Sequence, residues 1–292
     1  MKNILTVDVE EWFHPEALQH LFPPETWDEQ PSRLVPLMER LLDVFDAHNA
    51  KATFFVLGWV AEHHPKLVRQ LAERGHEVAT HSYSHRMATK LDVKTFKDDL
   101  QRSVKILQDT TGRDVLGFRA PTFSVTKKTF WVFNILAETG LKYDSSIYPI
   151  WHDRYGIPDA PRSVFEVQTD NGASIIEFPM PTLRILGKNF PFGGGGYLRL
   201  FPLRFTTMAI RRFNKEGFPA IVFMHPWEFD PQQPKVKMGR LQSLRHYANI
   251  GRNLDKIGYL LKTFEWTNFA DYLDQLKNQS DFKIKKLNIN AI

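Results

Sequence analysis

Residues 4–12 read ILTVDVEEW, an apolar run that ends in three acidic residues, Asp8, Glu10 and Glu11. Such a run is typical of a buried β-strand with polar groups at its C-terminal end. Side chains two positions apart in a strand face the same way, so Asp8 and Glu10 can face one site. Two close carboxylates raise one pKa unless a cation separates their roles, so a metal on Glu10 would leave Asp8 as a base. The alternative interpretation is a solvated strand end, because runs of charge usually face water.

Apolar runs and segments of helical spacing alternate along the chain. Strands are expected at residues 4–9, 52–57, 77–80 and 116–119, from 143 onward, and at 220–224. Helices are expected at residues 34–47, 64–74, 95–110 and 127–138, the first with Ser32 as its N-cap. This alternation is typical of βα units, and reactive residues follow the strands, as they do in parallel barrels. The sequence therefore predicts a single barrel-like α/β domain.

The region after residue 150 is less regular. Residues 150–200 are rich in proline and predict loops with one short strand at 174–178. The four glycines at 193–196 predict a flexible loop near the substrate rather than a phosphate loop, because no Lys-Ser/Thr follows them. Helices are expected within 240–262 and 267–277, and residues 281–292 are expected to form a loosely ordered tail.

His81 and His85 form a second group of candidate functional residues, in the stretch HSYSH. Histidines four positions apart lie on the same side of a helical turn and can chelate one metal ion. Two histidines and one carboxylate make the open site of a catalytic zinc enzyme, in which bound water is acidified. The chain has no cysteine, so thiolate ligands are excluded. The alternative is two unrelated polar histidines near a helix start.

Arg119 and His225 each follow an expected strand. Arg119 can pair with Asp8 and keep it ionised, although a structural surface arginine is the simpler interpretation of this residue alone. His225 can act as a general acid near neutral pH, and a hydrogen-bonded core histidine is the alternative.

The formal net charge is +5 and the isoelectric point about 9.2, with the cations spread along the chain. No nucleic-acid motif or basic arm is present, so we expect no nucleic-acid partner; an anionic membrane or a phosphate-bearing substrate fits the charge.

Residues 1–9 are too short for a signal peptide and no stretch approaches a membrane span, which predicts a cytoplasmic protein. Residues 197–212 predict either a segment that lies on an anionic membrane or a core helix with a basic face.

Taken in order, these motifs resemble those of the polysaccharide deacetylase superfamily (carbohydrate esterase family 4, the NodB-homology domain). HSYSH at 81–85 fits the family's H-S/T-x-x-H motif, Arg119-Ala120-Pro121 is similar to its R-x-P motif, and Met224-His225 to its late histidine motif. The sequence is more similar to one branch, found with bacterial exopolysaccharide export and exosortase loci. This likeness rests on DVEEWFH at 8–14, HPWEFD at 225–230 and residues 239–255, and it extends to about residue 275.

The resemblance implies a distorted (β/α)7-type barrel over residues 1–280, with a family-specific part from about 150. It implies a catalytic base at Asp8, a general acid at His225 and a supporting role for Arg119. The common family motif has two adjacent aspartates, but here Val9 stands at the second position and cannot bind a metal. We therefore assign the expected divalent metal, Zn²⁺, to Glu10, His81 and His85, with Glu11 as the second choice and weak or lost metal binding as the third. Substrate contacts are expected from Pro121, Trp227 and Tyr83.

The implied activity is metal-dependent removal of N-acetyl groups from an amino sugar in exopolysaccharide biosynthesis. A lipid-linked intermediate, such as an undecaprenyl-linked sugar at the inner face of the cytoplasmic membrane, or an oligosaccharide is the expected substrate. A deformylase or another C–N hydrolase of a lipid-linked amino sugar would use the same residues. A carbohydrate-binding protein with a decayed site is the alternative from another class. The oligomeric state is left open.

Overall fold

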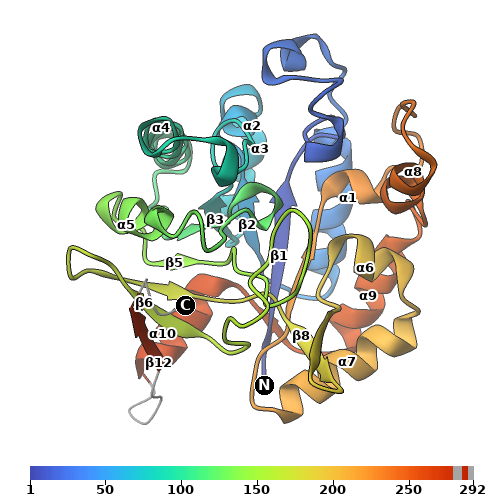
Figure 1. Cartoon of the computed structure of the whole chain (residues 1–292). Helices are drawn as coiled ribbons and strands as arrows, with labels where there is room; N and C mark the ends of the chain where they lie inside the picture. The colour runs from blue at the N-terminus through green and yellow to red at the C-terminus, as the bar shows by residue number, and fades with distance from the viewer. Residues whose placement is uncertain (279–284, 289–292) are drawn as a thin grey trace.

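The computed structural model describes residues 1–278 and 285–288, and its main feature is a curved, mostly parallel sheet (Figure 1). Seven strands lie side by side and parallel in the order β10 (Ile221–Met224), β1 (Asn3–Val9), β2 (Thr53–Val56), β3 (Glu77–Thr80), β4 (Gly117–Phe118), β5 (Tyr143–Asp144) and β7 (Ser174–Glu177). Beyond β7 the sheet continues with antiparallel β6 (Phe165–Gln168) and then β12 (Lys285–Asn288), while β11 (Trp266–Thr267) pairs with β1. The fold is a distorted α/β barrel, and within the described residues the sheet does not close between β10 and β12.

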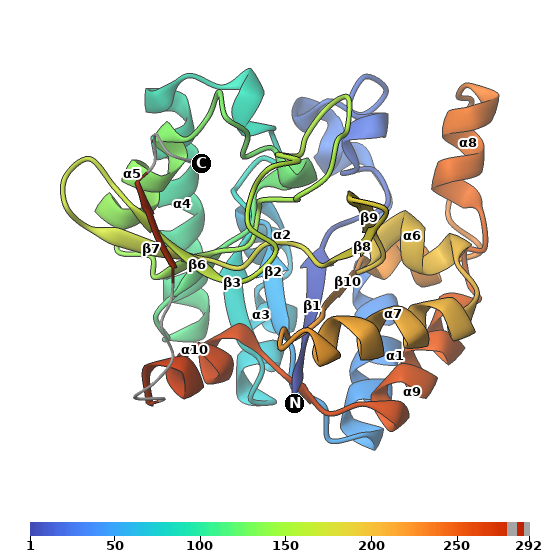
Figure 2. The ribbon, with the colours of Figure 1, turned by 60° about the horizontal axis from the view of Figure 1, so that its bottom comes forward.

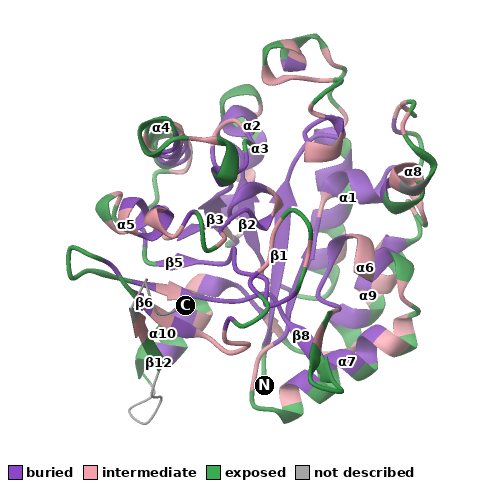
Figure 3. Cartoon of the chain, viewed as in Figure 1, coloured by how far each residue is buried: buried purple, intermediate pink, exposed green. Residues whose placement is uncertain are grey.

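Helices cover the outside of this sheet, as Figure 2 shows from a second direction. The helices of the first half are α1 (Leu34–Ala47), α2 (Gly58–His63), α3 (Pro65–Glu73), α4 (Val93–Thr111) and α5 (Trp131–Glu138). Those of the second half are α6 (Gly195–Leu200), α7 (Leu203–Lys215), α8 (Arg240–Tyr247), α9 (Asn253–Thr263) and α10 (Phe269–Asn278). Short 3-10 helices lie at Glu16–Leu18, Pro24–Glu29, Ala88–Lys90, Pro121–Phe123 and Pro226–Phe229. The central strands are buried on both faces (Figure 3), which is why they read as apolar runs.

The elements expected before residue 150 are confirmed, with boundaries shifted by a few residues. Ser32 is a correction, because the N-cap of α1 is Arg33 and the Ser32 hydroxyl instead donates to the Glu11 carboxylate. The helices expected within 240–262 are α8 and α9, which are separated by a turn in which Asn249 and Gly251 adopt positive φ. The region 150–200 holds more structure than expected, namely β6, α6 and the hairpin of β8 (Thr182–Ile185) and β9 (Lys188–Pro191). Within the expected tail, β12 is described, whereas 281–284 and 289–292 lie outside the described residues.

The glycines at 193–196 run alongside the outer edge of β10. The amide of Phe223 donates to the carbonyl of Gly193 at 2.9 Å, and Gly194 forms a parallel bridge with Phe223. A Cβ on Gly194 would lie 2.1 Å from the Phe223 carbonyl oxygen, so only glycine fits here. This close approach brings the glycine segment to the carboxyl end of β10. In the part of the chain that the structure describes, no helix is long and apolar enough to cross a membrane.

Candidate active site

The carboxyl ends of the central strands surround a cavity of about 220 Å³. Asp8 lies in β1, Glu10 directly follows it, and His81 and His225 follow β3 and β10. The cavity is lined by these four residues together with His85, and by the glycines at 194–196. The loops that continue the central strands therefore bring together the acids and histidines that the sequence singled out.

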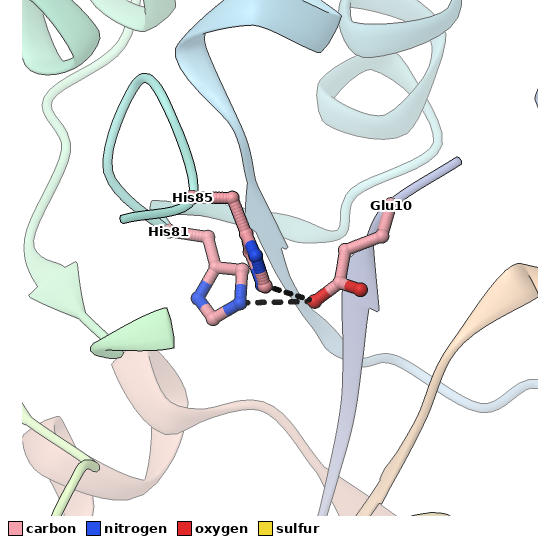
Figure 4. Close-up of side chains that lie close together, drawn as sticks. All are labelled: Glu10, His81 and His85. Atoms are coloured by element: carbon pink, nitrogen blue, oxygen red, sulfur yellow. Dashed lines mark hydrogen bonds and ion pairs between the residues drawn. The ribbon is translucent and has the colours of Figure 1, made fainter. Parts of the chain in front are cut away.

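Glu10, His81 and His85 converge on one point (Figure 4). One carboxylate oxygen of Glu10, Oε1, lies 3.2 Å from His81 Nε2 and 3.0 Å from His85 Nε2. Burial alone would raise the pKa of Glu10, but the charges of His85 and His225 and the histidine hydrogen bonds hold it well below its usual value. Glu10 is therefore an ionised, acceptor-only group at neutral pH. Two imidazoles and a carboxylate whose ligand atoms lie within 4.8 Å of one another fit the donor set of a catalytic zinc site.

The loop at 81–85 presents the two histidines differently from the expected helical turn. Ser82 and His85 both have positive φ, so the segment is a tight loop, and the helical-turn expectation is wrong. His81 Nδ1 lies 2.7 Å from the carbonyl oxygen of Arg119. Since a carbonyl can only accept, Nδ1 must carry a proton, and Nε2 is the ring nitrogen that faces Glu10 and would bind a metal. Gln19 donates to the carbonyl of His85 at 2.7 Å and steadies the other end of the loop.

Glu11 points away from this group. Its carboxylate accepts hydrogen bonds from the Ser32 hydroxyl and from the backbone amides of Arg33 and Leu34, at the start of α1. The negative charge thus lies where the helix dipole is positive. Burial raises the pKa of Glu11 and outweighs these hydrogen bonds. Of the two glutamates, only Glu10 belongs to the group that can hold a metal.

Asp8 and Arg119 form a buried ion pair, the contact expected from the sequence. Arg119 Nη1 donates to Asp8 Oδ1 at 2.7 Å and to the Thr6 hydroxyl at 2.8 Å, and Arg119 is fully buried. Its remaining donors reach the carbonyl and the hydroxyl of Ser145. The guanidinium lies over the Phe55 ring at 4.1 Å. These contacts fix the guanidinium of Arg119, which in turn fixes the position of Asp8. The second carboxylate oxygen of Asp8, Oδ2, faces His225.

His225 lies between Asp8 and Glu228. Its Nε2 is 3.7 Å from Asp8 Oδ2 and 3.9 Å from Glu10 Oε1, and its Nδ1 is 3.5 Å from Glu228 Oε1. Burial lowers the pKa of His225, but Glu10, Glu228 and Asp8 outweigh burial and raise it to about 9. His225 is therefore protonated at neutral pH, as a general acid requires.

Glu228 and Arg199 support His225 on the Nδ1 side of its ring, opposite Asp8. Arg199 Nε donates to Glu228 Oε1 at 3.0 Å, and both residues are buried. The other Arg199 donors reach the carbonyls of Arg245, His246 and Ala248. Nothing in the sequence marks Arg199 as a functional residue, because it lies in a helix of the irregular region and contacts Glu228 only in the folded chain.

The three residues expected to contact substrate differ in their position relative to the catalytic cavity. Trp227 lines the cavity and stacks on His225, with ring centroids 5.1 Å apart. Pro121 is buried beside the cavity, whereas its neighbours Ala120 and Thr122 line it. Tyr83 is separated from it, because its hydroxyl donates to Glu62 at 2.6 Å and its ring borders another surface hollow.

Other side chains that line the cavity come from segments where no spacing rule marks them. They lie in the loop before β6, in α6 and in the short helix after β1: Glu16, Tyr148, Arg154, Tyr155 and Tyr197. The glycine segment expected near the substrate is also part of the wall. Each of these contacts depends on the folding of loops that the sequence pattern leaves undetermined.

The carboxyl edge of this parallel α/β barrel carries two histidines and a carboxylate, beside a candidate base and a candidate acid. Barrel enzymes with such a site can catalyse metal-assisted hydrolysis. Residues 25–143 match the polysaccharide deacetylase family, and residues 145–274 match a domain of unknown function, DUF3473. The first part of the chain therefore matches the polysaccharide deacetylase family, and the second part fits the branch that the sequence resembled.

Curated relatives match over the first part. The peptidoglycan deacetylase of Helicobacter pylori is 32% identical over 108 residues, which cover 37% of this chain and 36% of the relative. The peptidoglycan-N-acetylglucosamine deacetylase PgdA of Listeria monocytogenes is 36% identical over 103 residues, covering 35% of this chain and 22% of the relative. The chain thus spans only about a third or less of the length of these relatives.

Solved structures support the fold over nearly the whole chain. A crystal structure from Mycobacterium smegmatis, assigned to the polysaccharide deacetylases, has a TM-score of 0.61 at 21% identity and covers 98% of this chain and 94% of its own. The structure of Puue allantoinase has a TM-score of 0.58 at 16% identity, covering 96% and 93%. At this identity the likeness shows the barrel and not the reaction.

Proposed function

We propose that this protein hydrolyses the acetamido group of an N-acetylated amino sugar. The observation that carries the proposal is the joint position of Asp8 and His225 beside the Glu10, His81 and His85 group. Amide hydrolysis needs a base for the attacking water and an acid for the departing amine. The site places the Asp8 carboxylate, which pairs with the Arg119 guanidinium, 3.7 Å from the protonated imidazole of His225.

Glu10, His81 and His85 would hold a divalent metal, for which we propose Zn²⁺. A cation bound there supplies acidified water and polarises the acetyl carbonyl. The chain's own contribution is the geometry of the donors: His81 is oriented by the Arg119 carbonyl and His85 by its tight loop.

Asp8 and His225 carry the proton transfers in this proposal. Asp8 takes the proton of the attacking water, and Arg119, which donates to Asp8 Oδ1 at 2.7 Å, holds that carboxylate in position. The tetrahedral intermediate then collapses, the C–N bond breaks, and His225 donates its proton to the departing nitrogen. Without that proton an amine is a poor leaving group. Acetate and a free amino sugar are the products.

The substrate that we propose is an intermediate of exopolysaccharide synthesis, as a lipid-linked sugar at the cytoplasmic face of the membrane or as an oligosaccharide. The match to DUF3473 supports the exopolysaccharide branch, and the basic net charge of +5 suits an anionic carrier or surface. The relatives named as peptidoglycan deacetylases support an N-acetylated sugar as the reacting unit.

The proposal is tested by incubating the purified full chain with a panel of soluble N-acetylated oligosaccharides, lipid-linked N-acetyl sugars and their N-formyl counterparts. We expect acetate release from at least one N-acetyl substrate and loss of that release with a chelator. Formate release without acetate would replace the deacetylase with a deformylase. Binding without release of either acid would leave only a carbohydrate-binding protein.

Glu228→Gln is expected to shift the pH profile of the reaction. Glu228 raises the pKa of His225, so wild-type kcat/KM should fall along an alkaline limb as this acid loses its proton. Removing the Glu228 charge lowers the pKa of His225, so the alkaline limb should move to lower pH. The measurement is kcat/KM between pH 6 and 10. An unchanged alkaline limb would contradict the general-acid role. Glu166→Gln on β6 is the control, because Glu166 does not line the catalytic cavity.

A further inference from the structure

The β8–β9 hairpin has an unusual tip. Its two turn residues, Leu186 and Gly187, have φ of 48° and 79°, which is the pattern of a type I′ turn. Asn-Gly is the usual sequence for such a turn, because a bulky residue is strained at positive φ. Leu186 is also 98% exposed. Among the described residues, nothing covers this strained and exposed leucine.

Other exposed apolar side chains gather around it. Trp151 is 81% exposed, and Ile185 and Phe190 of the hairpin are exposed as well. Asn189 donates to the Pro149 carbonyl at 2.8 Å, which ties the hairpin to the loop that carries Trp151. We call Trp151, Ile185, Leu186 and Phe190 the hairpin patch. In Figure 3 the hairpin beside α7 is largely exposed.

The charge around the hairpin patch is positive. Arg184, Lys188 and Lys285 are exposed, and none of them forms an ion pair with another described residue. Arg184 and Lys188 flank the tip, and both border the same hollow as Lys285 and Trp151. The acids of this region are already paired, Asp159 with Lys127 at 2.6 Å and Glu216 with Arg162 at 2.7 Å. The three free cations therefore surround the exposed apolar side chains with unbalanced positive charge.

We propose that the hairpin patch docks on an anionic lipid bilayer. A protruding aliphatic tip suits insertion among acyl chains, and tryptophan prefers the interface just above them. The cations at Arg184, Lys188 and Lys285 lie where anionic head groups would be. A saccharide chain would explain the aromatic side chains and the charge, but not a strained leucine that faces water. The patch is also narrow, a hairpin end and one loop, which suits shallow insertion better than a stable protein interface.

The sequence left two alternatives for residues 197–212, a segment that lies on a membrane and a core helix with a basic face, and the structure favours the second. That segment forms α6 and the first part of α7, and its Leu198, Ala209 and Ile210 are buried in the core. It is a core-packed segment with an exposed basic side. The hairpin, which contacts α7, offers the more exposed apolar group.

The hairpin patch also lies next to the candidate active site. A hollow of about 1050 Å³ lies between the hairpin and the loop at 149–163. Tyr197 borders both this hollow and the catalytic cavity. A sugar that hangs from a lipid carrier can therefore reach the catalytic cavity from a docked membrane. This last step rests on the proposed deacetylation, whereas membrane docking stands on the surface alone.

The test is co-sedimentation of the purified full chain with vesicles of phosphatidylcholine, with and without phosphatidylglycerol. We expect binding to the anionic vesicles that weakens with salt, and little binding to phosphatidylcholine alone. Leu186→Asn should lower the anionic-vesicle affinity about tenfold by removing the inserted side chain. Because Asn-Gly suits a type I′ turn, this variant should melt no lower than wild type, so lost binding cannot be ascribed to unfolding.

Leu244→Asn is the matched control, since Leu244 is a 61% exposed leucine on α8, and it should bind vesicles like wild type. Acetate release from a soluble substrate should be unchanged in Leu186→Asn, which separates failure of docking from failure of the proposed activity. Equal vesicle binding by wild type and Leu186→Asn would overturn the proposal. So would absence of vesicle binding, whether the patch then binds an anionic polysaccharide or mediates self-association that Leu186→Asn abolishes.

Discussion

Asp8→Asn is expected to lower kcat about 10²- to 10⁴-fold while leaving metal binding intact, which is the range for loss of a general base. Asparagine keeps the shape of the side chain and can still accept the hydrogen bond of Arg119, now 2.7 Å from Asp8 Oδ1. It cannot take a proton from water. Asp8 is not part of the Glu10, His81 and His85 group, so the metal content should not change.

The same substitution leaves Arg119 buried without its counter-ion. We therefore expect a loss of stability of about 1–3 kcal/mol, the cost of leaving a buried polar group poorly satisfied. Activity must be compared at a temperature where circular dichroism shows both proteins folded. Asp98→Asn, on the exposed side of α4, is the control and should be fully active. Full turnover by Asp8→Asn would remove Asp8 from the mechanism.

His81→Ala is expected to abolish both metal binding and activity. It removes one of three ligand atoms, so metal affinity should fall by more than the 10- to 100-fold that is typical when only a ligand-orienting partner is lost. The measurement is the metal content after dialysis against a buffered metal solution, together with acetate release. His48→Ala, at the exposed end of α1, should retain both. Normal metal content in His81→Ala would contradict the assignment.

Glu10→Gln and Glu11→Gln separate the two adjacent glutamates. Glu10→Gln should lose metal, because its carboxylate oxygen contacts both histidines. Glu11→Gln should keep metal but lose stability, because its carboxylate holds the start of α1. The opposite result would return the ligand role to Glu11.

The position of Val9 in β1 explains why the carboxylate that can bind a metal is Glu10, two positions after Asp8. Val9 is fully buried in the core and pairs with Val56 of β2. Strand alternation therefore turns position 9 away from the cavity that Asp8 and Glu10 line. A carboxylate at position 9 in this backbone would be buried among apolar side chains, whereas Glu10, just past the strand, reaches the histidines.

The first half of the chain could be predicted because its signals are local. The apolar runs of β1, β2 and β3 are buried on both faces, and Gly75 and Gly140 have the positive φ that ends a helix. The pairing of Asp8 with Arg119 could be proposed because both follow strands whose carboxyl ends share one edge. The conformation of the loop at 81–85 could not be predicted, because its amides bond to the distant carboxylate of Asp99 and it holds positive φ at Ser82 and His85.

The region after residue 150 resisted prediction because its structure depends on distant partners. Strand β6 is held by β7 and β12, and the hairpin by contacts with α7 and the Pro149 carbonyl. The support of His225 depends on Glu228, in the 3-10 helix after β10, and on Arg199 of α6, 29 positions before Glu228. The hydrophobic periodicity of the sequence does not predict such long-range contacts.

The central claim is that Glu10, His81 and His85 hold the metal on which N-deacetylation depends. Its most direct test is one titration, in which Zn²⁺ is added stepwise to metal-free protein while acetate release from an accepted N-acetylated substrate is measured. We expect no release without metal and a rise in release that saturates at one zinc ion per chain. Undiminished release by the metal-free protein, unaffected by added zinc, would contradict it.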